Sequence, residues 1–207
     1  MKYPRTYHLP WSEGRTSDDK VLSVEQLHNF EGREVVITEK RDGENSTLRY
    51  DKVHARSLDS KDHESRHWLK SLWDSIRYSI PENFRICGEN LFAKHSIYYD
   101  NLDTYFEVFS IWENDKCLSW DDTIEYCELL NLKPVPVIYR GVYGSEKMWD
   151  RISKYLLNDN VEGYVIRLCD SFSYYNFDIS VAKWVRKNHV QTDKHWMNQP
   201  IVKNKLK

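Results

Sequence analysis

The sequence is poor in cysteine and contains no long apolar run. Its four cysteines lie far apart and form no Cys-x-x-Cys pair, which argues against a zinc ribbon or a disulfide framework and predicts a reducing, cytoplasmic setting. The N-terminus lacks the apolar region of a secretory signal, and no stretch approaches the length of a membrane span. We therefore expect a protein without a membrane partner.

The sequence also lacks a bulk excess of charge. There are 30 basic side chains against 32 acidic ones, so any nucleic-acid site has to come from local clustering of basic groups. Residues 183–207 form one such cluster, because they contain seven basic residues and a single acid, interleaved with tryptophans. Residues 3–8 and 92–98 add further basic and aromatic groups that could contact RNA. The last five residues, 203–207, are instead expected to be a solvated tail.

The apolar patterns predict an α+β protein with largely antiparallel sheets and flanking helices. Helices are expected after Ser23, over 68–76, after Ser119 and after Ser145, the last with Trp149 and Ile152 facing inward. The expected strands cover 34–40, 46–50, 53–57, 84–89, 105–112, 135–139, 163–169 and 179–185. No linker interrupts the series, so residues 1–207 are expected to form a single domain without a sizeable C-terminal one.

The most informative segment is Glu39-Lys40-Arg41-Asp42-Gly43, where an apolar strand runs into a turn. A lysine presented in this way can attack a nucleotide phosphate, but only as the free amine. Its pKa therefore has to be lowered, and we expect Lys183 and a bound metal to lower the pKa of Lys40. In isolation Lys40 would be an exposed lysine at a strand end, so the interpretation depends on its companions.

Five further segments follow in a fixed order. Two of them carry the glutamates Glu89 and Glu162 beside a glycine at a strand end, where backbone and ligand can approach closely, and this favours metal or ribose contacts. The segments are Ala55-Arg56-Ser57, Cys87-Gly88-Glu89-Asn90-Leu91, Phe106-Glu107-Val108-Phe109, Val161-Glu162-Gly163-Tyr164-Val165-Ile166 and Val181-Ala182-Lys183-Trp184-Val185-Arg186.

This series resembles the motifs of the covalent nucleotidyltransferases, the superfamily of ATP-dependent ligases and capping enzymes, and most closely those of the RNA ligase family. The resemblance implies an adenylate-grasp nucleotidyltransferase fold. It also implies an enzyme that forms lysyl-AMP on Lys40, passes AMP to an RNA 5′-phosphate, and joins that end to a 3′-hydroxyl with release of AMP, in RNA repair. ATP and a divalent metal, Mg²⁺ or Mn²⁺, are the implied cofactors.

The resemblance also assigns roles in nucleotide binding. Glu39 would meet the adenine edge through its backbone, and Phe109 would stack on the adenine. Glu89 would bind the ribose, and Arg56 the ribose or an RNA phosphate. Of the remaining positions, Glu162 would be associated with the metal and Lys183 would contact the α-phosphate, and both would share in catalysis with Lys40.

For the later, RNA-dependent steps, the resemblance assigns a role to Asn45. Lys94 and His95 are our candidates for binding a terminal phosphate, and Arg186 is a further candidate for RNA. The family often has a second lysine in its last motif, where this sequence has Val185. Little of the sequence remains for the separate C-terminal domain that many of these ligases use on duplex RNA, and a protein partner could replace it.

Two alternatives stay open. A capping guanylyltransferase would use GTP with the same Lys-x-Asp-Gly motif, although Asn45 favours a ligase. An RNA-end-binding module without catalytic activity would be expected to lose Lys40, Glu89 or Glu162, and all three are present. Tolerance of DNA depends on contacts to the 2′-hydroxyl group, which the sequence does not reveal.

Overall fold

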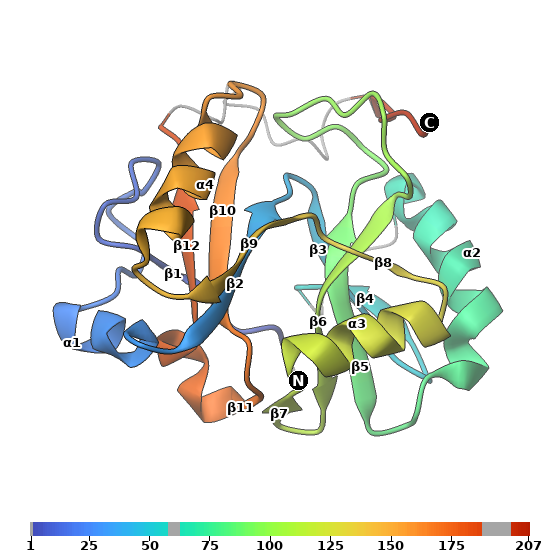
Figure 1. Ribbon diagram of the computed structural model, residues 1–207. Coiled ribbons are helices and arrows are strands. Elements are labelled where there is room, and N and C mark those ends of the chain that lie inside the picture. Colours follow the sequence, from blue (N-terminus) through green and yellow to red (C-terminus); the bar gives the residue numbers. More distant parts are fainter. Residues whose placement is uncertain (1, 58–62, 188–199) are drawn as a thin grey trace.

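The computed structural model describes residues 2–57, 63–187 and 200–207. They form two β-sheets with helices packed on their outer sides (Figure 1). The strand pairs are antiparallel except for two, β1 with β12 and β6 with β8, which are parallel. The predicted α+β class with largely antiparallel sheets is therefore confirmed. None of the described helices is both long enough and apolar enough to cross a membrane.

The first sheet, sheet A, is built around the apolar strand β2. Val35, Val36 and Ile37 on this strand are fully buried, since β2 is covered on both faces. The strand order is β1-β12-β10-β2-β9. The strands cover Tyr7–His8 (β1), Val181–Val185 (β12), Gly163–Leu168 (β10), Glu34–Lys40 (β2) and Val137–Val142 (β9).

The second sheet, sheet B, has the order β11-β7-β6-β5-β3-β4, with β8 beside β6. Trp112 and Cys87 of this sheet lie in one buried cluster with Ile37 and Ile166 of sheet A, so the two sheets share a core. The strands cover Phe172–Ser173 (β11), Lys116–Cys117 (β7), Phe106–Glu113 (β6), Phe84–Asn90 (β5), Glu44–Leu48 (β3), Val53–Ala55 (β4) and Lys133–Pro134 (β8).

Two of the helices start where the serines at their N-termini predict. The side chain of Ser119 accepts a hydrogen bond from Asp122 N–H, and that of Ser145 accepts one from Met148 N–H. The helices cover Val24–Leu27 (α1), His67–Ile76 (α2), Trp120–Leu129 (α3) and Glu146–Leu156 (α4), with 3₁₀ turns at His28–Phe30, Glu64–Arg66, Arg77–Ser79 and Tyr174–Ile179. In Figure 1, α1 and α4 lie beside sheet A, and α2 and α3 beside sheet B.

Three expectations need correction. Trp149 is 38% exposed, because Met148 and Ile152, one turn apart, form the buried face of α4. Strand β12 begins at Val181 because the preceding residues form the 3₁₀ turn Tyr174–Ile179. Residues 203–207 are not a solvated tail, since their backbone is hydrogen-bonded to residues 92–102. The short strands β1, β7, β8 and β11 were not predicted, because two residues are too few to show a pattern.

Candidate active site

Lys40 lies where the chain passes from one sheet to the other. It is the last residue of β2 and pairs with Gly163 of β10, and the next strand, β3, belongs to sheet B. Gly43 makes this crossing possible, because a Cβ atom there would lie 2.5 Å from the carbonyl oxygen of Asn90. The end of β2 therefore brings Lys40 to the junction of the two sheets.

A cavity of about 400 Å³ opens at this junction. Its volume is in the range of small-molecule binding sites. Seven residues predicted from the sequence line it: Glu39, Lys40, Asn45, Arg56, Glu89, Phe109 and Lys183. Thirteen further residues complete the lining: Tyr3, Pro4, Arg5, Thr6, Asp19, Thr38, Arg41, Ser110, Val135, Val165, Arg167, Phe172 and Val181.

The charged groups of sheet A are brought together by strand register. Lys40 of β2 lies opposite Gly163, and Lys183 of β12 lies opposite Val165, so the two lysines flank β10. Glu162 immediately precedes β10, and its Oε1 accepts a hydrogen bond from Lys40 Nζ at 2.5 Å. Gly163 allows the close approach of β10 and β12, because a Cβ atom there would lie 2.0 Å from the carbonyl oxygen of Trp184.

The pKa of Lys40 differs from the expectation. Burial acts to lower this pKa, but the carboxylates of Glu162 and Glu89 outweigh burial and raise it above the ordinary lysine value. Lys183 shows the opposite behaviour, because burial and then the charge of Lys40 lower its pKa to about 8. Without ligand or metal, the pKa of Lys40 is therefore raised and not lowered as expected, since the two carboxylates dominate.

Glu89 completes a cluster of carboxylates around Lys40. Burial raises the pKa of Glu89 to about 8, with the charges of Glu162 and Asp42 adding to the effect and Lys40 opposing it. This crowding of acidic groups is relieved by added positive charge, and carboxylate oxygens are the ligands that Mg²⁺ prefers. Glu162 and Glu89 therefore fit a divalent cation that also binds phosphates. The described residues contain no cluster of three or more side chains that would hold a metal alone.

The apolar part of the cavity lies between side chains of both sheets. Phe109 on β6 lines it from sheet B, and Val165 on β10 lines it from sheet A. The ring of Tyr3 meets that of Phe109 edge to face, with centroids 5.1 Å apart. Aromatic and apolar walls of this kind suit a planar base.

Glu39 lines the same cavity, but its groups are partly used within the protein. Its backbone N–H donates to the carbonyl of Pro136 at 2.9 Å. Its carboxylate pairs with Arg41, and Arg41 also pairs with Glu107, each at 2.6 Å. The predicted backbone contact between Glu39 and adenine stays a prediction.

Two residues predicted for the RNA-dependent steps lie together at the cavity. Arg56 N–H donates to the carbonyl of Asn45, and Arg56 Nε donates to the carbonyl of Tyr3 at 3.5 Å. Within the described ranges, the buried Oδ1 of Asn45 has no hydrogen-bond partner. A buried acceptor of this kind is suited to a hydroxyl or amine of a ligand.

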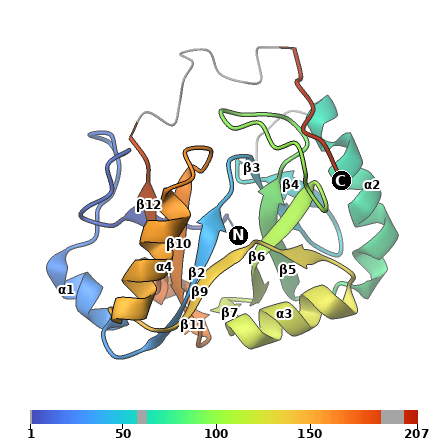
Figure 2. The ribbon, with the colours of Figure 1, turned by 45° about the horizontal axis from the view of Figure 1, so that its top comes forward.

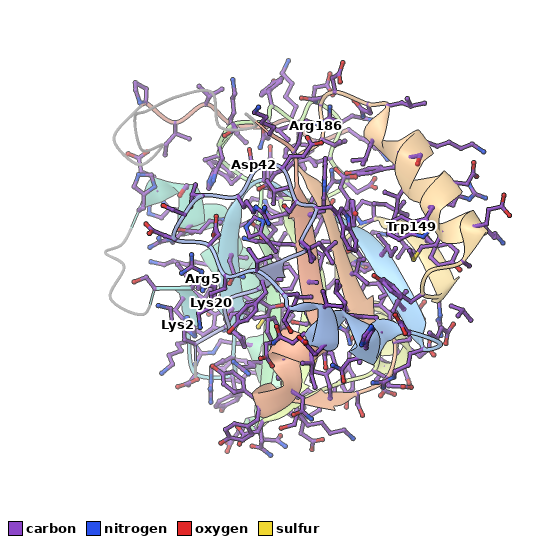
Figure 3. The ribbon with its side chains drawn as sticks, turned by 90° about the vertical axis from the view of Figure 1, so that its left-hand side faces the viewer. Lys2, Arg5, Lys20, Asp42, Trp149 and Arg186 are labelled. Atoms are coloured by element: carbon purple, nitrogen blue, oxygen red, sulfur yellow. The ribbon has the colours of Figure 1, made fainter. Side chains whose placement is uncertain are left out.

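Three other predicted RNA-binding residues do not line the cavity. Lys94 and His95 belong to the segment after β5, and their RNA contact stays a prediction. The Arg186 side chain donates to Asp159 Oδ1 at 3.0 Å and to the carbonyls of Leu156 and Asn158 at 2.8 Å. It therefore stabilises the segment after α4, and Figure 3 shows Arg186 well away from Arg5. Residues 188–199 of the predicted basic stretch lie outside the described residues.

Val185 stands where the family often has a second lysine. It is 2% exposed, and its side chain lies next to Gly14. A charged side chain at this position would lose its hydration, so the apolar residue follows from the packing.

The N-terminal segment, which the sequence indicated only as a possible RNA contact, contributes four residues to the cavity lining. Residues 3–6 line the cavity because β1 pairs in parallel with β12, with His8 opposite Lys183. Arg5 donates to Asp19 Oδ1 at 3.1 Å and to the Asp18 carbonyl at 2.8 Å. Figure 3 shows Arg5 on the same face of the molecule as Lys2 and Lys20. The only signal in the sequence was the alternation of basic and aromatic residues in this segment.

Comparisons with known proteins agree with this architecture. A family model described as RNA ligase matches residues 33–185. The structure of Naegleria gruberi RNA ligase with PPi superposes with a TM-score of 0.55 at 18% identity, over 89% of this chain and 57% of that chain. An archaeal ATP-dependent RNA ligase has a TM-score of 0.60 at 14% identity, over 91% of this chain and 49% of that chain.

A putative ATP-dependent DNA ligase from Aquifex aeolicus has a TM-score of 0.56 at 21% identity, over 91% of this chain and 50% of that chain. Mutants of the Naegleria gruberi ligase have been solved with AMP and Mn and with ATP and Mn. No match was found among curated proteins. This chain spans 49% to 57% of the length of the three relatives compared, and at these identities the likeness establishes the nucleotidyltransferase fold.

Proposed function

The chain belongs to the RNA ligase family, and we propose that it is an ATP-dependent RNA ligase that carries AMP on Lys40. The observation that carries this proposal is that Lys40 and Lys183, on the strands that flank β10, line a cavity with an aromatic wall, and that Glu162 just before β10 accepts a hydrogen bond from Lys40. In this proposal residues 1–207 act as one nucleotidyltransferase domain.

In the first step, the unprotonated Nζ of Lys40 attacks the α-phosphorus of ATP. The N–P bond forms while the bond from the α-phosphorus to the bridging oxygen breaks, and pyrophosphate leaves. Lys183 bears positive charge below its pKa of about 8 and would stabilise the negative charge of the transferring phosphoryl group. When bound, Mg²⁺ or Mn²⁺ at Glu162 and Glu89 would balance the phosphate charge and offset the carboxylates that raise the pKa of Lys40.

In the second step, an oxygen of the RNA 5′-phosphate attacks the same phosphorus, and Lys40 leaves as an amine that takes up a proton. Asn45 and Arg56 line the cavity from sheet B and would orient the incoming RNA end. In the third step, the RNA 3′-hydroxyl attacks the activated 5′-phosphate, a phosphodiester bond forms, and AMP leaves. Positioning of the reactants supplies most of the acceleration in such transfers.

The test of the first step is labelling with each α-³²P nucleoside triphosphate in the presence of Mg²⁺. Purified protein, freed of bound AMP by incubation with pyrophosphate, is expected to gain a label from ATP that survives denaturation. Lys40→Arg is the matched variant, because arginine keeps a cation beside Glu162 but is not a nucleophile at neutral pH. It is expected to stay folded and to gain no label.

Other outcomes of this experiment have defined meanings. Label from GTP would replace the proposal with a capping guanylyltransferase. No label from any nucleotide, with folded wild-type protein, would favour an RNA-end-binding module without catalytic activity. Sealing of a nicked duplex with RNA or DNA on each side of the nick then tests the RNA preference. Labelling without sealing would indicate that a protein partner is needed.

A further inference from the structure

We propose that residues 200–207 hold the 41–43 turn in place through the 91–105 loop, and that Asn204 is a positioning residue for Lys40. The functional part of this inference rests on the proposed function. Residues 200–207 run beside the 91–105 loop in both ribbon views (Figures 1 and 2). Two isolated β-bridges join them, Ala93 with Lys203 and Leu102 with Leu206.

Asn204 is the centre of this contact and is 1% exposed. Its Nδ2 donates to the carbonyl of Leu91 at 2.8 Å, and its Oδ1 accepts from Tyr99 N–H at 2.9 Å. Its backbone N–H donates to the carbonyl of Phe92, and its carbonyl accepts from the hydroxyl of Tyr105 at 2.9 Å. One buried side chain and its backbone therefore bind the 91–105 loop at four points.

Further backbone hydrogen bonds join the loop to residues 200–207. Lys94 N–H donates to Val202, and Leu102 N–H donates to Lys205. In the opposite direction, Lys205 N–H donates to the carbonyl of Tyr99. The 91–105 loop contains no helix or strand of its own, so these bonds satisfy groups that would otherwise need water.

The same loop binds the turn that follows Lys40. The hydroxyl of Tyr99 accepts from Asp42 N–H at 3.0 Å, and the guanidinium of Arg41 lies 4.9 Å from the centre of the Tyr99 ring. Asp42 Oδ2 accepts from the N–H groups of Ser96 and Ile97, both at 2.7 Å. Tyr99 therefore connects Asn204 with the turn. Its backbone N–H binds Asn204, its ring faces Arg41, and its hydroxyl binds Asp42.

This connection bears on the reaction because Arg41 directly follows Lys40. Strand β2 holds the backbone of Lys40 on its N-terminal side, and the 41–43 turn holds it on its C-terminal side. In-line attack on phosphorus is sensitive to position, and a misplacement of about 1 Å can cost on the order of 10²-fold in rate. Residues 200–207 thereby influence Lys40 without lining the cavity.

The test combines hydrogen exchange with labelling by ATP in the full-length chain. Asn204→Ala removes both side-chain bonds and is expected to speed amide exchange in residues 40–44 and 91–105 by about tenfold or more. In single turnovers at saturating ATP, it is expected to slow formation of lysyl-AMP by about 10- to 100-fold, with less than about threefold change in the half-saturating ATP concentration.

Two controls separate positioning from stability. Lys203→Ala lies in the same segment, and among the described residues its side chain lies over the rings of Phe92 and Tyr105. It is expected to leave the labelling rate within about twofold. Thr123→Ala removes a buried hydroxyl that donates to the Ser119 carbonyl at 2.8 Å in α3. It is expected to lower the melting temperature without changing exchange in residues 40–44 or the labelling rate of the folded protein.

Tyr99→Phe keeps the inference testable if Asn204→Ala fails to fold. It removes only the hydroxyl that accepts from Asp42 N–H, and it is expected to speed exchange in residues 40–44 and to slow labelling while residues 200–207 stay protected. Unchanged exchange in residues 40–44 in the folded variants would overturn the inference, and so would faster exchange with an unchanged labelling rate. A wild-type protein that gains no label would instead overturn the proposed function, and hydrogen exchange would still decide whether residues 200–207 hold the turn.

Discussion

The two sheets contribute different things to the cavity. Sheet A supplies Lys40 and Lys183, whose spacing is set by the ladder between β2, β10 and β12, and Glu162 just before β10 accepts a hydrogen bond from Lys40. Sheet B supplies the ring of Phe109 and the amide of Asn45, on strands β6 and β3. The comparison indicates that changes in sheet A should mainly affect the chemical step, and changes in sheet B should mainly affect binding.

Among the variants that test this division, the largest effect on the reaction is expected from replacing Lys183 in sheet A. Lys183→Met should lower the rate of lysyl-AMP formation by about 10²- to 10³-fold, the loss typical of removing one group that stabilises developing charge. The fold should tolerate the change, because burial already disfavours the charged form of Lys183. Single-turnover labelling at saturating ATP, together with thermal unfolding, measures both effects.

Lys187→Met is the matched control for Lys183, because Lys187 is exposed and does not line the cavity. It should leave the labelling rate within about twofold. A Lys183→Met variant that raised only the KM for ATP would contradict the assignment of sheet A to the chemical step.

The next largest effect is expected from Phe109 in sheet B. Phe109→Ala should raise the KM for ATP by about 10- to 100-fold, which corresponds to the 1–3 kcal/mol that stacking of a base on an aromatic ring typically contributes. Phe109→Leu keeps apolar volume but no ring, and it should fall between the wild type and Phe109→Ala. Initial rates over a range of ATP concentrations check this, and a fall in kcat at unchanged KM would break the proposed division between the sheets.

A smaller effect is expected from pH, and it involves both sheets. Above pH 8, Lys183 in the free protein loses its charge and the carboxyl of Glu89 gains one, because both pKa values are about 8. Each change disfavours an anionic ligand, so each should weaken binding by up to about tenfold per pH unit. The affinity for α,β-methylene-ATP, measured without divalent metal between pH 7 and pH 9.5, reports this without chemistry.

Variants separate the two contributions to the pH dependence. Lys183→Arg keeps its charge throughout this range, and Glu89→Gln has no charge to gain. In each variant, the slope of log Kd against pH above pH 8 should therefore be smaller by about one than in the wild type. An unchanged slope in either variant would show that the corresponding group does not contact the bound nucleotide.

The smallest effect is expected from Arg5. This residue lines the cavity, but it precedes residues 33–185, which the family model matches. Its side chain is 44% exposed and pairs with Asp19, so its attraction for a phosphate is partly screened by solvent. Arg5→Ala should raise the KM for ATP by about 3- to 10-fold, and the effect should shrink at high salt. Lys20→Ala removes a charge on the same face without touching the cavity, and an equal effect from it would indicate only a general loss of positive charge.

Local sequence was sufficient for much of the fold. The end of β2 at Lys40 and the starts of α3 and α4 at their serine caps followed from the apolar pattern and from capping chemistry, which act over a few residues. The order of the motifs was enough to predict the family, which the family match confirms. Seven of the predicted site residues line one cavity, whereas Glu162, Lys94, His95 and Arg186 do not, and the individual roles of all of them stay predictions.

Only the tertiary structure decided the electrostatics and the supports of the site. The pKa of Lys40 is raised because Glu162, 122 residues away in the sequence, lies within a hydrogen bond of it. Residues 3–6 reach the cavity through the pairing of β1 with β12, and Asn204 reaches the 91–105 loop across 105 residues. Such contacts depend on how distant segments pack in three dimensions, and patterns over a few neighbouring residues carry no information about that packing.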